Sequence, residues 1–204
     1  MLVQLHCRFS HINDHKLQHI TRQLNIIIPP GAHLPQCRSC IHKKQKLPPV
    51  HKGPAPHTTQ PFQWLYANLI GPFPEPSNSG AMYSLNIIDS HTHCAWGFLL
   101  HGKGNTSPAL KDFFSVVAYQ EHSPCKTLIT NSSQEFINHS LSKWLAKQGI
   151  LHNTTPTHTP EFNSMVEHFN STFLSSIHTT LNTSGLKRHW WGKATHSAIL
   201  TYNI

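Results

Sequence analysis

The sequence predicts an α/β fold in which a mixed five-stranded sheet is flanked by helices and is preceded by a small helical module. Two observations carry this prediction. From residue 62 onward, short apolar segments with strand-like spacing alternate with longer segments of helical periodicity. Before residue 48 the chain holds a Cys-x-x-Cys pair, histidines and a basic run, and a Pro-rich stretch follows. The predicted domains are therefore residues 1–47, an extended linker at 48–61 and a second domain at 62–204.

The strands are predicted from apolar runs that end at turn residues. The run that begins at Phe62 ends at Gly71-Pro72, and two further runs lie close enough in the chain to pair as a hairpin. Two short runs follow nearer the C-terminus. The predicted strands are 62–70, 83–89, 94–100, 126–130 and 150–153.

The helices are predicted from apolar residues spaced by three and four. Leu17, Ile20 and Leu24 predict an amphipathic helix of about a dozen residues in the first module. In the second domain, Pro108 lies near the start of one helix and Gly149 closes another. The predicted helices of that domain are 107–119, 141–148, 165–181 and 190–202.

Composition narrows the class of protein. The 204 residues include 16 Lys and Arg against 8 Asp and Glu, a formal charge of +8, which points to a polyanionic partner and to nucleic acid first. Only 12% of residues are charged, which excludes a charged disordered tail. No apolar run is long enough to span a membrane, and the N-terminus lacks a secretory pattern, so the expected location is nuclear or cytoplasmic. The five cysteines are expected to be metal ligands and free thiols.

A zinc site is predicted in the first module. His6 and His11 form an H-x4-H pair, and Cys37 and Cys40 form a C-x2-C pair. Zinc prefers nitrogen and thiolate ligands in a tetrahedral arrangement, and two such pairs allow one ion to join distant segments. Among 19 histidines such a pair also arises by chance, and His15 offers alternative pairings with its neighbours on a helix.

Several spaced motifs follow one another along the second domain. They are Tyr66-Ala-Asn-Leu-Ile-Gly-Pro-Phe-Pro74, Ile88-Asp89-Ser-His-Thr-His93, Thr130-Asn-Ser-Ser-Gln-Glu-Phe136, Glu161-Phe-Asn-Ser-Met-Val-Glu167-His-Phe-Asn170 and the segment from Ser184 to Asn203. These motifs resemble those of retroelement integrases of the copia-type retrotransposon group and run in that family's order, and the resemblance covers roughly residues 5–204. The resemblance implies an RNase H-like integrase core and assigns zinc to His6, His11, Cys37 and Cys40 as the His-His-Cys-Cys module.

The resemblance also places a catalytic triad and shows how this chain departs from it. Integrases join DNA by phosphoryl transfer on Mg²⁺ ions that three carboxylates hold. The corresponding positions here are Asn68, Asn131 and Glu167, so two of the three carboxylates are amides. Mg²⁺ prefers anionic oxygen, and we expect its binding and the strand-transfer activity to be lost. Neither Asp89 nor Glu135 replaces the missing acids, because the family carries both beside an intact triad.

The departures suggest a history. Asn in place of Asp, Ser in place of Gly at 132 or 133, and His in place of Arg each follow from one G-to-A change in a codon. Our hypothesis is a degenerate fragment of a transposable-element polyprotein, a pseudoenzyme. The alternative is a domesticated, non-enzymatic DNA-binding or interaction protein on the same fold. If the turn at 132–133 requires a positive φ, serine there costs on the order of 1 kcal/mol.

The expected partner is DNA, bound weakly and without sequence preference. RNA is a second nucleic-acid partner, and a folded chain is expected to form a homo-oligomer. Phosphate contacts depend on Lys and Arg. The candidate DNA-binding residues are Lys43, Lys44, Lys46 and Lys103.

Overall fold

The computed structural model describes residues 1–43, 58–121, 125–155 and 160–204. Most of the predicted linker, together with Lys44 and Lys46, lies outside these residues. By contact the chain divides into two compact units. We call residues 50–169 the sheet unit and residues 1–49 with 170–204 the helical unit.

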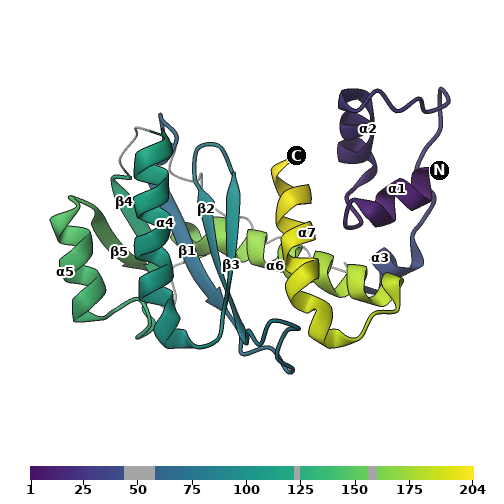
Figure 1. Ribbon diagram of the computed structural model, residues 1–204. Coiled ribbons are helices and arrows are strands. Elements are labelled where there is room, and N and C mark those ends of the chain that lie inside the picture. The colour runs from purple at the N-terminus through teal and green to yellow at the C-terminus, as the bar shows by residue number, and fades with distance from the viewer. Residues whose placement is uncertain (44–57, 122–124, 156–159) are drawn as a thin grey trace. The chain divides into compact units, whose positions relative to one another are not determined.

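The sheet unit is built on a five-stranded mixed sheet with the strand order β3-β2-β1-β4-β5 (Figure 1). Strand β1 pairs antiparallel with β2, which pairs antiparallel with β3 as the predicted hairpin. On its other side β1 pairs in parallel with β4, and β4 with β5. The strands are β1 (Trp64–Ile70), β2 (Tyr83–Asp89), β3 (Ala95–Leu100), β4 (Thr127–Asn131) and β5 (Leu151–Thr155).

Two helices cover the core of this sheet. Apolar residues of α4 (Thr106–Glu121) and α5 (His139–Lys147) form one cluster with residues of the central strands. Asn138 caps α5, because its Oδ1 accepts from the backbone N–H of Leu141 at 2.9 Å. Gly149, with φ of +72°, ends the helix in the left-handed region, as expected. The buried cluster includes Leu65, Leu85, Leu110, Phe113, Leu128, Phe136, Leu141 and Leu145.

The helical unit joins the two ends of the chain. It contains α1 (Leu2–Arg8), α2 (Asp14–Gln23), α3 (Arg38–Lys43), the C-terminal part of α6 (Pro160–Ser184), a 3₁₀ turn η2 (Arg188–Trp190) and α7 (Trp191–Asn203). Ser176 Oγ donates to the carbonyl oxygen of Ser10 at 3.0 Å, and Lys16 Nζ donates to that of Tyr202 at 2.7 Å. These bonds tie the C-terminal helices to the N-terminal ones.

The predicted fold class is confirmed, including the order of strands and helices after residue 62. The one predicted helix of the first module is α2, and the short helices α1 and α3 were not predicted. Among the described residues, no helix combines the length and the apolarity that crossing a membrane requires.

Candidate functional site

The four residues expected to bind zinc lie together in the helical unit. His6 lies on α1, His11 in the turn after it, Cys37 just before α3 and Cys40 on α3. Their ligand atoms all lie within 4.8 Å of one another. Cys40 Sγ lies 3.3 Å from His6 Nε2, Cys37 Sγ lies 3.4 Å from His11 Nδ1, and the two histidine nitrogens are 3.0 Å apart.

This arrangement fits a tetrahedral zinc ion. Zinc lies about 2.0–2.3 Å from nitrogen and sulfur ligands, which sets the ligands of a tetrahedron about 3.3–3.8 Å apart. The observed separations approach these values. The donor set of two nitrogens and two thiols is also the one that structural zinc sites use. The group could therefore hold zinc.

The local backbone prepares the histidines for this role. His6 Nδ1 lies 2.8 Å from the carbonyl oxygen of Ile12, so the Nδ1–H donates there and Nε2 is left as the lone-pair nitrogen that faces the thiols. Ser10 and His11 have φ of 50° and 57°, a left-handed turn that L-residues adopt at a cost. This turn brings His11 back beside α1, where its backbone N–H donates to the carbonyl oxygen of His6 at 2.7 Å. Both imidazoles are almost fully buried.

The second candidate site lies on the two central strands of the sheet unit. Asn68 near the end of β1 and Asn131 at the end of β4 follow paired positions of two parallel strands. Their side chains meet, and Asn131 Nδ2 donates to Asn68 Oδ1 at 3.3 Å. We call these two residues the amide pair. The hydroxyl and the backbone N–H of Ser133 both donate to Asn131 Oδ1.

The polar neighbours of the amide pair on the adjoining strand are uncharged. Asn86, opposite Asn68 on β2, is buried and accepts a hydrogen bond from Ser84 Oγ at 2.8 Å. Amides and hydroxyls thus line the strands where anionic oxygen would be needed. Two carboxylates at this separation would repel each other, whereas an amide donor and an amide acceptor satisfy each other without a cation.

Glu167, at the third triad position, and the nearby acid Asp89 lie on other elements than the amide pair. Glu167 lies on α6 with an exposed side chain. Asp89 is fully buried and has a structural role, because its carboxylate accepts from the backbone N–H groups of Phe62 (3.0 Å) and Thr92 (2.9 Å) and from the Thr92 hydroxyl (2.7 Å). It faces Leu65 across the sheet, three positions along the strands from the Asn68–Asn86 pair.

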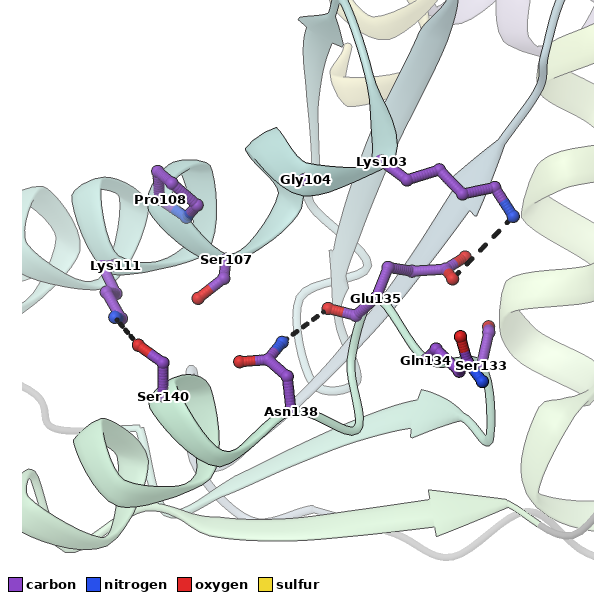
Figure 2. Close-up of a pocket in the computed structure, with 10 residues that line it drawn as sticks. All are labelled: Lys103, Gly104, Ser107, Pro108, Lys111, Ser133, Gln134, Glu135, Asn138 and Ser140. Atoms are coloured by element: carbon purple, nitrogen blue, oxygen red, sulfur yellow. Dashed lines mark hydrogen bonds and ion pairs between the residues drawn. The ribbon is translucent and has the colours of Figure 1, made fainter.

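A cavity of about 740 Å³ opens between the start of α4 and the β4–α5 loop (Figure 2). Glu135 points toward Lys103, with 3.9 Å between Oε2 and Nζ, and its side chain is only 9% exposed. Lys111 Nζ donates to Ser140 Oγ at 3.1 Å. Ser133 lines this cavity and also bonds to Asn131, so the cavity adjoins the amide pair.

The turn after β4 does not have the positive φ for which the sequence analysis allowed a cost. Neither Ser132 nor Ser133 has a positive φ, so serine carries no penalty of that kind there. The sequence reasoning also missed Lys111 and Ser140, which lie on different helices. Ser107 and Lys111 are four residues apart and therefore lie on one face of α4. This spacing was the sequence signal that could have indicated the polar lining of the cavity.

Of the candidate DNA-binding lysines, the described ones fall in different units. Lys43 ends α3 and is exposed, whereas Lys103 lines the cavity of the sheet unit beside Glu135. An acid within reach of Lys103 offsets much of its charge. The two lysines therefore do not form one surface within either unit.

Comparison with known proteins gives consistent results. No protein-family model matches the chain. The chain is 22% identical over 198 residues to the retrovirus-related Pol polyprotein from transposon TNT 1-94 of Nicotiana tabacum, covering 97% of this chain and 15% of that protein. It is 28% identical over 174 residues to the transposon Ty1-DR4 Gag-Pol polyprotein of Saccharomyces cerevisiae, covering 82% of this chain and 11% of that protein. The chain therefore spans a small part of the curated relatives it matches.

Solved structures show the same fold. A chain of the simian T-cell lymphotropic virus intasome, in complex with PP2A regulatory subunit B56 gamma, matches with a TM-score of 0.58 at 14% identity, over 98% of this chain and 68% of that one. The HTLV-2 integrase catalytic core domain in complex with magnesium matches with a TM-score of 0.53 at 10% identity, over 71% of this chain and 87% of that one. The chain is a retrotransposon integrase-family protein. This integrase-family chain combines the integrase-core sheet with a His-His-Cys-Cys group of metal-binding geometry.

Proposed function

We propose that this integrase-family chain is a non-catalytic nucleic-acid-binding scaffold, held together by zinc and without the magnesium chemistry of its relatives. The observation that carries the proposal is the hydrogen bond between Asn131 and Asn68. Strand transfer requires metal ions held by carboxylates, and at this place the chain has two neutral amides that satisfy each other. Of the three triad positions only Glu167 carries a carboxylate, and a single carboxylate binds Mg²⁺ weakly.

The zinc part of the proposal rests on the donor set of His6, His11, Cys37 and Cys40. An ion there would join α1, the following turn and α3, which are short elements with little core of their own. Structural zinc contributes about 10–16 kcal/mol to the folding of finger peptides. Its role here is to stabilise the helical unit and not to take part in a reaction.

The proposed binding to nucleic acid is supported by the net positive charge of the chain and by its similarity to integrases. The net charge of +8 favours contact with phosphates, which is insensitive to sequence and weakens with salt. DNA is the proposed partner, with RNA as a second ligand. We also propose that the chain self-associates, which its likeness to a chain of an intasome supports. A nuclear location is proposed because integrases act on chromosomal DNA.

The test compares the wild-type chain with an Asn68→Asp/Asn131→Asp variant in magnesium-dependent 3′-end nicking and strand transfer. We expect the wild type to be inactive. The double variant should gain activity if the rest of the scaffold is intact, and adding Glu167→Gln should abolish the gain. Magnesium-dependent activity of the wild type, itself lost in Glu167→Gln, would refute the proposal.

A further inference from the structure

The positive charge of the chain is divided very unequally between its two units. The helical unit contains ten of the sixteen Lys and Arg residues and one of the eight acids, a net charge of nine positive. The sheet unit contains six lysines and seven acids, a net charge of one negative. The whole positive balance of the protein therefore lies on the helical unit, whereas the amide pair belongs to the sheet unit.

Within the helical unit, three elements bring basic groups together. Ser39 of α3 accepts hydrogen bonds from Asn182 Nδ2 at 3.3 Å and from Thr183 Oγ1 at 3.2 Å, so α3 lies against the end of α6. Lys43 follows Ser39 by one helical turn, and His178 precedes Asn182 by one turn, which places each on the contacting face of its helix.

Electrostatics agrees with this placement. Burial, followed by the positive charges of Lys43 and Arg188, lowers the pKa of His178. Arg188 begins η2, immediately after the turn that ends α6, and Lys187 precedes it with an exposed side chain. Charges from α3 and η2 thus act on one imidazole of α6. We call Lys43 and Arg188, whose charges act on this imidazole, together with Lys187 the basic cluster.

The acids of the chain do not neutralise this cluster. Asp14 is the one acidic side chain in the sequence of the helical unit, and it accepts hydrogen bonds from Gln18 Nε2 (3.2 Å) and from the backbone N–H of Leu34 (3.1 Å). Neither Lys43 nor Arg188 forms a salt bridge within the part of the chain that the structure describes. Like charges gathered at one place repel one another, and a bound polyanion would offset that cost.

We propose that the basic cluster of α3 and η2 is the surface on which this protein binds the phosphate backbone of duplex DNA. The inference rests on the proposed nucleic-acid binding and locates it on the helical unit. The sheet unit, with its near-neutral balance and its Lys103–Glu135 pair, contributes little to affinity. Phosphate contacts of this kind position a protein on DNA and carry no sequence information, which agrees with binding that does not depend on base sequence.

The test measures binding of a labelled duplex of arbitrary sequence to the zinc-loaded full chain from about 50 to about 200 mM salt. The first variant is Lys43→Gln/Arg188→Gln. The matched control is Lys143→Gln/Lys147→Gln, which removes the same charge from exposed positions of α5 in the sheet unit. Circular dichroism and zinc content establish that both variants fold, and a Lys187→Gln single variant offers a milder change in the same cluster.

We expect the cluster variant to bind about tenfold or more weakly at the lower salt, with the slope of log affinity against log salt reduced by about 2. The α5 control should bind as the wild type does. Equal loss in both variants, or loss in the control alone, would overturn the assignment to the helical unit. If the wild type binds no duplex, the proposed nucleic-acid binding itself fails. Cluster-dependent binding of single-stranded RNA without duplex binding would overturn the choice of DNA.

Discussion

Replacing both members of the amide pair by carboxylates should make the stability of the sheet unit depend on a divalent cation. Asn131 Nδ2 and Asn68 Oδ1 are 3.3 Å apart, so the Asn68→Asp/Asn131→Asp variant sets two anionic oxygens against each other at a similar separation. At an effective dielectric constant of about 20, two unit charges this close repel by about 5 kcal/mol.

Two effects reduce that figure. One aspartate can take up a proton, which at neutral pH costs about 4 kcal/mol for a group with an ordinary pKa of about 3.9. Both positions are also half-exposed, so water screens the repulsion. We therefore expect the double variant to lose about 1–3 kcal/mol of unfolding free energy without a cation. Each single variant should lose much less, because the Asn68→Asp carboxylate still accepts from Asn131 Nδ2, and in Asn131→Asp the Asn68 amide can turn over to donate.

Urea unfolding of the wild type, both single variants and the double variant measures this coupling as a double-mutant cycle. Zinc is kept constant, and the series is repeated with millimolar Mg²⁺. The reasoning predicts that Mg²⁺ restores the double variant and leaves the other three proteins unchanged. If the two single effects are additive and Mg²⁺ has no effect on the double variant, positions 68 and 131 do not form a common cation site in this fold.

Three other predictions concern the zinc group, the half-buried His152 and the buried Cys125. Chelation of zinc should unfold the helical unit, which circular dichroism would detect as a loss of helical signal. The Cys37→Ser variant should show the same loss without a chelator. Unchanged ellipticity after chelation would contradict this prediction. Burial lowers the pKa of His152, so the unfolded chain binds a proton that the folded chain releases, and stability present above about pH 6.5 should fall as the pH is lowered through that value. When the pH is lowered from about 7.5 to about 5.5, the urea concentration at the unfolding midpoint should therefore fall more for the wild type than for His152→Gln. Equal falls in the two proteins would show that His152 is not the cause. Burial raises the pKa of Cys125 to about 12, so iodoacetamide at about pH 8 should label this thiol only after unfolding, as peptide mass spectrometry would show.

The fold could be predicted from the sequence because local signals agree with the tertiary structure. The run 83–89 is strand β2 residue for residue, and Leu110, Phe113 and Phe114 of the predicted helix 107–119 are buried in the core, whereas Val116 is exposed. The helices α1 and α3 were missed because seven and six residues are too few for periodicity to appear. Their helical form depends on packing in the helical unit and not on local propensity.

The candidate site could be predicted in part. Ligand spacing and family resemblance selected His6, His11, Cys37 and Cys40, and the structure brings these four together. The hydrogen bond within the amide pair required the register of two strands that are not adjacent in sequence. The basic cluster could not be predicted, because Lys43 and Arg188 are separated by most of the chain and come near the same imidazole, His178, only through the packing of α3 on α6.

The side-chain amide of Asn131 is susceptible to deamidation, and its place at the end of β4 slows that reaction. Asn131 precedes Ser132, a small residue. In a flexible chain the backbone nitrogen of Ser132 can attack the side-chain carbonyl carbon of Asn131 and expel ammonia, and hydrolysis of the resulting succinimide gives aspartate or isoaspartate. In the fold, Asn131 pairs with Thr155 across the sheet, and its side-chain oxygen is held by Ser133. The fold therefore slows this cyclisation, and ageing of denatured protein would slowly return a negative charge to a position where the resemblance to integrases places a carboxylate.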